Sequence, residues 1–351
     1  MKNIKRIISI GLIFIFALGL TACGSKAGDS NDAADESANV KVIKLWINKA
    51  ESDDEGKVYR ALVDKFNDSN TLSVDGKSTL RIKLEYKGTA ETLSTAISSE
   101  MLTGGLPDVI ALDATSYAAY KTEGIIVPID DYITEEEKNS YVDSVIEQAT
   151  IDGKLYGLSA MDAPGGLYYN KEIITKDVLA KAGVEDYGTI ENPWSWDDVY
   201  SVLKVLREEG KPHQIKLNLG FGGTEGCMYL YSSLIYSAGG TFSENGKISE
   251  GLTKEASLNG LRSLEKILKN ENGENYSYTG ENADAFAQGE VPLQIYGPWD
   301  ITTIRKNYKD FESKYDIMPL PVYEKDETKG EIATPCGSWG LAVTKDSKNV
   351  A

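Results

Sequence analysis

The sequence predicts an α/β protein of two lobes with a ligand cleft between them, and three observations lead to this prediction. The chain has 351 residues, more than one compact core usually holds. Residues 40–112 alternate strand and helix patterns in the order β-α-β-α-β, which is typical of a doubly wound lobe. The glycine-rich segment 151–171 then separates this unit from a second α/β unit, so we expect the chain to cross between lobes there.

Residues 1–22 have the pattern of a secretory signal: a basic start, an apolar run over 7–20 and small residues before Cys23. The apolar run is too short to favour a stable transmembrane helix. Residues 24–39 are mostly Ser, Ala, Asp, Asn and Gly, which cannot bury a core. We therefore expect a flexible tether between the signal and the folded body.

The first lobe follows from apolar spacing. Residues 40–47 predict a strand buried on both faces, with Trp46 packed inside it. A stripe of Val58, Leu62, Val63 and Phe66 predicts a helix, and residues 93–101 predict a second one. Residues 80–86 alternate as a strand, and residues 108–112 form a buried apolar strand.

Polar residues follow two of these strands. Asn48 and Glu51 come after the first strand, and Asp113 comes after the third. Because ligands of such sheets bind beyond the carboxyl ends of the strands, all three are candidate ligand contacts. Helix capping or a first-turn charge on the helix dipole is the alternative for the two acids. Asp162, in the crossing segment, either faces the cleft or only solvates a loop.

The second unit contains further predicted elements. Ser195 and Asp198 have the spacing of a capping box, and Trp194 can pack on Val199. Residues 229–235 suit a buried helix, residues 286–296 read as a short helix, a turn and a strand, and residues 315–320 as a strand. Trp299 follows a Gly-Pro break and is expected to be exposed, with core packing as the alternative. Residues 336–340, with Trp339 between small residues, predict a second crossing, after which residues 341–344 return as a strand to the first lobe.

Composition excludes several function classes. A formal charge of −17 disfavours nucleic-acid binding, which needs basic patches. His213 is the one histidine, and we expect it at the surface, so a catalytic triad or a zinc site is improbable. Cys23, Cys227 and Cys336 form no CxxC motif. We expect no catalytic residues, no metal and no cofactor, while a Cys227–Cys336 pair is left open.

Several motifs recur in the order of one family: Leu20-Thr-Ala-Cys-Gly24, Gly153-Lys-Leu-Tyr-Gly-Leu158, Gly165-Gly-Leu-Tyr-Tyr-Asn-Lys171, Pro193-Trp-Ser-Trp-Asp-Asp198, Gly297-Pro298-Trp299 and Gly337-Ser-Trp-Gly340. The chain resembles the extracellular solute-binding proteins, family 1, of bacterial ABC transporters, the sugar-binding group related to maltose-binding protein. The resemblance implies a type II periplasmic-binding-protein-like fold. The ordered set of motifs spans the chain.

The resemblance also implies boundaries. Residues 1–22 would be a lipoprotein signal peptide and 23–39 the lipidated Cys23 with its tether. The N-terminal lobe would comprise residues 40–161 and 341–351, and the C-terminal lobe 165–335. The hinge would consist of a first crossing segment, 162–164, and a second crossing segment, 336–340. By the same resemblance, a C-terminal segment of the family would be missing after Ala351.

The function implied is capture of an extracellular carbohydrate, an oligosaccharide by preference, and its delivery to the permease subunits of an ABC transporter. The protein would be held on the extracytoplasmic face of the cell membrane by the lipid on Cys23. In the family, the tryptophan matching Trp299 stacks on a sugar ring, and Trp339 would also reach the cleft. Leu112, Thr115 and Ser116 stand where the maltose-type subgroup has Trp, Asp and Arg, so maltose itself is not implied.

Two alternatives stay open. A binding protein of this kind could take a polyamine, a polyol phosphate or a metal chelate instead of a sugar. Phosphate would need Arg or Lys at the cleft, whereas the candidate positions Glu51, Asp113 and Asp162 are acidic. A secreted carbohydrate-active enzyme using two carboxylates is the competing class, because 54 acidic residues always leave room for a suitable pair.

Overall fold

The computed structural model describes residues 39–219, 223–269, 272–325, 328–335, 337 and 339–350. The predicted signal and most of the tether, with Cys23, as well as Cys336 and Ser338, lie outside the described residues. Within those ranges no helix is long and apolar enough to cross a membrane. The chain separates into two compact units, residues up to 42 with 61–82, and residues 43–60 with 83–351. The lobe boundaries given above therefore stay a prediction.

The first sheet has the strand order β2-β1-β3-β13-β6. β1 pairs parallel with β3, and β13 pairs antiparallel with both β3 and β6. The predicted β-α-β-α-β order and the late return strand are thus confirmed. The elements of this part are β1 (Val40–Ile47), α2 (Asp54–Asp68), β2 (Thr79–Tyr86), α3 (Ala90–Thr103), β3 (Val109–Asp113), η1 (Ala114–Ser116), α4 (Tyr117–Thr122), η2 (Asp130–Tyr132), α5 (Glu135–Lys138), α6 (Asp143–Ala149), β4 (Thr150–Ile151), β5 (Lys154–Leu155), β6 (Leu158–Ser159) and β13 (Trp339–Val343).

Two expectations about burial in this part were wrong. Val42 of β1 is 49% exposed, because only the last part of β1 pairs with β3, through Leu45 and Trp46. On α2 the apolar stripe does not face inward as a whole: Val63 is buried, but Val58 and Leu62 are more than half exposed. The side that α2 buries carries Gly56 and Val63, two helical turns apart.

The second crossing segment is shorter than predicted. β13 begins at Trp339, so Trp339 and Gly340 are strand residues rather than part of a connecting loop. Gly340 pairs with Ser159 of β6 and with Leu112 of β3, which fixes the register of the strand. Trp339 is therefore held by a hydrogen-bonded ladder, and its ring orientation follows from the pleat of the sheet.

The second sheet has the order β10-β7-β9-β8, with β7 antiparallel to both neighbours and β8 parallel to β9. Its elements are β7 (Gly166–Asn170), α7 (Lys176–Ala182), α8 (Trp196–Glu208), β8 (Ile215–Lys216), α9 (Gly223–Ser237), α10 (Ile248–Leu252), α11 (Glu255–Leu268), β9 (Leu293–Tyr296), α12 (Trp299–Asn307), η3 (Lys309–Phe311), β10 (Tyr315–Met318), β11 (Glu324–Lys325) and β12 (Thr328–Lys329).

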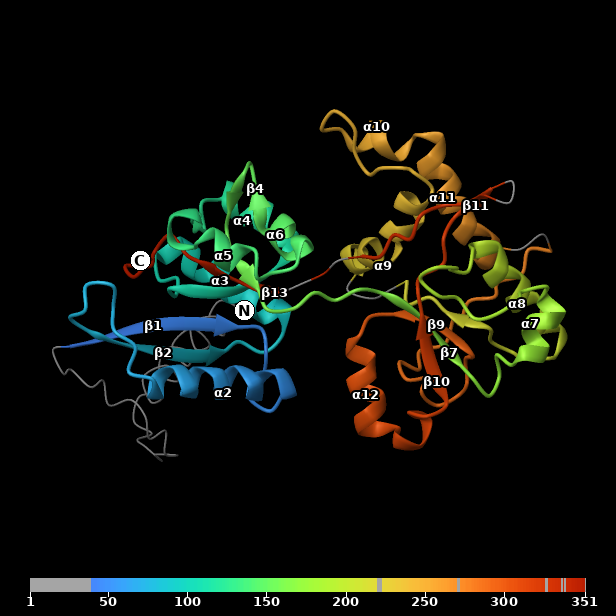
Figure 1. Cartoon of the computed structure of the whole chain (residues 1–351), viewed down its shortest axis with the longest axis horizontal. Coiled ribbons are helices and arrows are strands. Elements are labelled where there is room, and N and C mark those ends of the chain that lie inside the picture. Colours follow the sequence, from blue (N-terminus) through green and yellow to red (C-terminus); the bar gives the residue numbers. More distant parts are fainter. Residues whose placement is uncertain are drawn as a thin grey trace, which may run out of the picture. The chain divides into compact units, whose positions relative to one another are not determined.

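Alternate residues of β7 enter different apolar clusters. Leu167 and the neighbouring Ile295 of β9 pack into the large core that contains residues of α7, α8, α9 and α11. Tyr168 packs instead with Ile304 of α12 and with Phe311 and Tyr315. Figure 1 shows α12 on one side of β7, β9 and β10, and α7 and α8 on the other. α12 thus covers its own face of the second sheet.

Local signals in this part behave largely as expected. Ser195 and Asp198 form the predicted capping box, and Trp194 and Val199 share the large core. The predicted helix at the start of 286–296 is wrong: residues 283–289 form turns. Gly289, at φ 76°, ends this run in a left-handed conformation that a helix does not continue. His213 is half-buried, and its ring lies edge-on to Tyr278 with the ring centroids 4.9 Å apart.

Candidate functional site

A cavity of about 540 Å³ lies beside the carboxyl end of β3. One wall comes from the first turns of α3, and the other from β3, η1 and the start of β13. The lining combines an indole, two carboxylates and several hydroxyl groups. The lining residues are Ala90, Glu91, Leu93, Ser94, Thr95, Ile97, Ala111, Leu112, Asp113, Thr115, Ser116, Tyr120 and Trp339.

Trp339 and Asp113 are directly opposite each other on β13 and β3. Directly opposite residues of an antiparallel pair project to the same face of the sheet, with Cβ atoms about 5 Å apart. The structure thus brings together two of the predicted site residues, although 226 positions of sequence separate them. The cavity therefore has a flat apolar surface beside a hydrogen-bond acceptor.

The side chain of Asp113 also caps η1. Its Oδ1 accepts the Thr115 N–H at 3.2 Å and the Thr115 Oγ1–H at 2.9 Å. The capping alternative weighed for Asp113 is therefore correct, and the residue lines the cavity as well. Because the cap fixes its rotamer, Asp113 presents its carboxylate to the cavity at little further entropic cost.

The buried side chain of Tyr117 packs against β13 at Gly340. Its side chain is only 1% exposed, and its hydroxyl lies against Gly340 and Gly157, where a Cβ would overlap it at either position. Burial, and secondarily the Asp113 carboxylate, raises the pKa of the Tyr117 phenol. Within the described residues this buried hydroxyl has no hydrogen-bond partner. Close packing, rather than hydrogen bonding, therefore fixes Tyr117 against β13.

The other predicted polar residues do not line this cavity. Asn48 is buried at the end of β1, and Glu51 is exposed in the turn that follows. Asp162 is tied into its own neighbourhood: its Oδ2 accepts the Ser144 hydroxyl at 2.6 Å, and its Oδ1 accepts the Ala163 N–H at 2.9 Å. A ligand role for these three residues stays a prediction.

Trp299 is the first residue of α12 and is half-buried, not exposed as expected. Its ring lies edge-on to Tyr296, with centroids 5.2 Å apart, and tilted against Tyr229, with centroids 6.1 Å apart. Gly297 makes this position possible, because a Cβ there would overlap the Trp299 ring. The Tyr168 hydroxyl donates to the Gly297 carbonyl at 2.7 Å and so supports the turn.

Charged side chains lie beside this aromatic group. Buried Gln294 donates through Nε2 to Asp300 Oδ2 at 2.6 Å, one residue after Trp299. Burial raises the pKa of the Asp300 carboxyl. Burial lowers the pKa of Lys216, although the Asp300 and Asp284 carboxylates oppose this effect. The side-chain amide of Gln294 thus anchors the first turn of α12 through Asp300. The charge of Lys216 is partly compensated by the nearby carboxylates.

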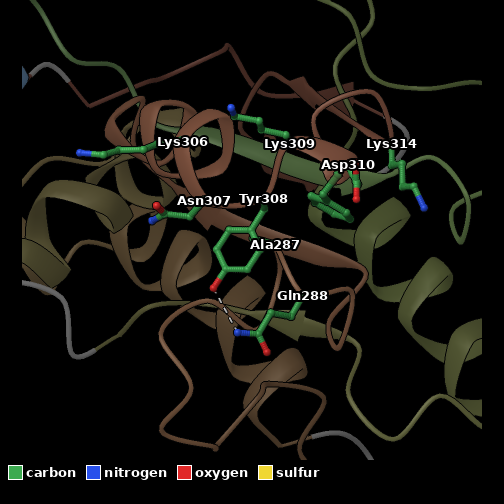
Figure 2. Close-up of a pocket in the computed structure, with 9 residues that line it drawn as sticks. Ala287, Gln288, Lys306, Asn307, Tyr308, Lys309, Asp310 and Lys314 are labelled. Atoms are coloured by element: carbon green, nitrogen blue, oxygen red, sulfur yellow. Dashed lines mark hydrogen bonds between the residues drawn. The ribbon is translucent and has the colours of Figure 1, made fainter.

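Another cavity, of about 580 Å³, lies at the end of α12 and carries Lys306, Lys309 and Lys314. Figure 2 shows their ammonium groups pointing in separate directions, so they do not enclose one anion. Gln288 Nε2 donates to the Tyr308 hydroxyl at 3.1 Å, and that hydroxyl donates to Asp284 at 2.6 Å. Because Gln288 and Tyr308 bond to each other and the three ammonium groups do not converge, we assign this cavity no ligand.

Sequence reasoning missed the contribution of α3. Glu91, Ser94 and Thr95 line the cavity, but the helix was predicted only from the apolar spacing over residues 93–101. The N-cap Thr89, which accepts the Thr92 N–H, was a usable signal, since it places the start of α3 just after the carboxyl end of β2. Among the residues described, no group of three His, Cys, Asp or Glu side chains could hold a metal ion.

Comparison with known proteins shows the relatives of this chain. An arabinooligosaccharide-binding protein of Bacillus subtilis is 23% identical over 72% of this chain and 56% of its own length. A maltodextrin-binding protein of the same organism is 24% identical over 99% of this chain and 74% of its own length. The chain spans 57% of the length of the first curated relatives it matches.

Solved structures show the fold. The crystal structure of the cyclic alpha-maltosyl-1,6-maltose binding protein from Arthrobacter globiformis matches with a TM-score of 0.68 at 18% identity, over 89% of this chain and 72% of that one. The chain therefore has the type II periplasmic-binding-protein-like α/β fold. The family model of the bacterial extracellular solute-binding protein matches residues 49–351. The chain belongs to the bacterial extracellular solute-binding protein family.

Proposed function

We propose that this protein captures an extracellular carbohydrate, an oligosaccharide by preference, for an ABC transporter. The observation that carries the proposal is the Trp339–Asp113 pair in a cavity rich in hydroxyl groups. A sugar ring has an apolar C–H face that fits a flat indole, and a rim of hydroxyls that bond to carboxylates and side-chain hydroxyls. The relatives named for arabinooligosaccharide and maltodextrin support the same ligand class.

The proposal includes the organisation of the whole protein. Ligand contacts from two lobes would favour a closed state around a hinge formed by residues 162–164 and by the segment that precedes β13, and the permease would recognise this closed state. The lipobox at Cys23 supports a lipid anchor on the extracytoplasmic face of the membrane. In this mechanism the protein binds and releases its ligand without covalent chemistry, so no catalytic residue is required.

A cationic solute is the second candidate, because the cavity carries the two carboxylates Glu91 and Asp113. A sugar and a cationic solute can be distinguished by the side chain on which binding depends. Stacking on a neutral ring depends on the indole of Trp339, whereas binding of a polyamine depends on the negative charge of Asp113.

The test is calorimetric titration of the complete mature protein and its variants. For a sugar ligand, Trp339→Ala should weaken binding about 10-fold or more, a loss of about 1.4 kcal/mol. Trp196→Phe is the matched control, because Trp196 is buried in the core of the second sheet. Unchanged affinity in Trp339→Ala would refute the assignment of this cavity to a sugar.

A further inference from the structure

Tyr229 of α9 contacts both predicted crossing segments. Its hydroxyl donates to the carbonyl of Ala163, in the first crossing segment. Its ring lies against Gly337, in the second crossing segment, so closely that a Cβ at Gly337 would overlap ring atom Cε2. One side chain therefore holds a hydrogen bond to one segment and a packing contact with the other.

The two segments are also joined to each other. The Ala163 N–H donates to the Gly337 carbonyl at 2.8 Å, and Asp162 Oδ1 accepts the same N–H at 2.9 Å. The peptide groups on both sides of Ala163 are thus engaged: its N–H by Gly337 and its carbonyl by Tyr229. Removing the Tyr229 hydroxyl would release one of these two restraints.

The third contact of Tyr229 is with Trp299. The two ring centroids are 6.1 Å apart with an interplanar angle of 35°, within the range of favourable aromatic pairs. Trp299 is itself backed by Tyr296 and by Gly297. Tyr229 therefore contacts Trp299 as well as Ala163 and Gly337 of the two crossing segments.

We propose that Tyr229 is a positioning residue that couples Trp299 to the two crossing segments. A ligand that moves the indole thereby changes the restraint on the hinge, and hinge movement changes the surface that Trp299 offers. The mechanical coupling stands on the contacts alone, whereas its use in ligand capture rests on the proposed function. Energetically, such coupling can shift the conformational equilibrium only by the difference in contact energy between the two states.

Tyr231 provides a matched control on the same helix. Its hydroxyl also donates to a main-chain carbonyl, that of Leu217, but this residue lies in the core of the second sheet. Tyr229→Phe and Tyr231→Phe therefore remove the same chemical group and the same type of hydrogen bond from α9. They differ in whether the lost bond reaches a crossing segment.

The deciding measurement is hydrogen–deuterium exchange of the complete mature protein without ligand. In Tyr229→Phe, amides of residues 160–166 should exchange about 2- to 10-fold faster, as expected for loss of one hydrogen bond. Tyr231→Phe should leave that peptide at the wild-type rate. Equal rates in wild type and Tyr229→Phe, or equal acceleration in both variants, would overturn the proposal.

A second readout reports on the indole. With 5-fluorotryptophan incorporated, the ¹⁹F resonance of Trp299 should shift in Tyr229→Phe and stay in place in Tyr231→Phe. An unmoved resonance in both variants would overturn the coupling even if exchange changes. Neither readout uses a ligand. If the protein binds none of maltotriose, arabinotriose and spermidine, that result contradicts the proposed function. The coupling by Tyr229 is still tested by the exchange rates and by the ¹⁹F resonance.

Discussion

Gly340→Ala tests how β13 is held beneath the candidate cavity. A Cβ at this position would overlap the Tyr117 hydroxyl and would lie 3.0 Å from the Leu158 carbonyl oxygen. Neither neighbour can yield easily, because Tyr117 is 1% exposed and Leu158 belongs to the adjacent strand β6. We therefore expect the substitution to push β13 away from β6 and α4.

The magnitude follows from two opposing effects. Overpacking a closed site costs about 1–3 kcal/mol. Replacing Gly by Ala restricts the unfolded chain, which returns about 0.4–1 kcal/mol. Because the overlap with the buried Tyr117 hydroxyl is severe, we expect a cost near the upper end, so the free energy of unfolding should fall by about 2 kcal/mol. Since Trp339 precedes Gly340 on β13, ligand affinity should fall as well.

Urea unfolding measures the change, with Gly165→Ala as the matched control. A Cβ at Gly165 would meet only side-chain atoms of Pro335 and Leu320, the nearest at 3.1 Å, so its cost should stay below about 1 kcal/mol. Adding Tyr117→Phe to Gly340→Ala should recover part of the loss, because the overlapping hydroxyl is gone. Wild-type stability of Gly340→Ala, or a double variant no better than the single one, would refute the packing argument.

Two further predictions concern the second sheet. Burial raises the pKa of Asp300 from 3.8, so its stabilising contribution is full below pH 3.8 and is lost as pH rises through the higher folded-state value. Asp300→Asn should thus gain stability relative to wild type as pH rises from 3 to 7, measured by urea unfolding at each pH, and a pH-independent difference would contradict this. Ser195→Ala removes the cap of α8, whose Oγ accepts the Asp198 N–H at 3.1 Å, and should cost about 1 kcal/mol of unfolding free energy. An unchanged urea midpoint would show that water or another group replaces the cap.

Local sequence patterns predicted the order of elements well. The strands of the first sheet and the capping box at Ser195 follow from side-chain spacing, which acts over a few residues. Spacing could not predict that Val58 and Leu62 of α2 would stay exposed, because burial depends on which neighbours the helix finds. The exposure of Trp299 was misjudged for the same reason. Its ring is covered by Tyr296 and by Tyr229, and the sequence does not reveal that these side chains contact it.

The candidate site was predicted in part. Asp113 and Trp339 were both chosen from the sequence, but their pairing depends on the antiparallel register of β13 with β3, which connects residues far apart in the chain. Glu91 and Ser94 were missed because their part in the cavity depends on how α3 packs on the sheet. The sequence therefore predicted that the site lies at the carboxyl end of the strands. Which residues line the cavity there depends on tertiary packing.

The proposed function requires that the protein binds a neutral carbohydrate. The most direct test is tryptophan fluorescence of the complete mature protein, without lipid and tether, titrated with neutral mono- and oligosaccharides, spermidine and glycerol 3-phosphate. We predict a saturable change with one class of neutral sugar, with an affinity about 10-fold lower or weaker still in Trp339→Ala. A saturable response to spermidine alone, or to glycerol 3-phosphate alone, would contradict the carbohydrate assignment.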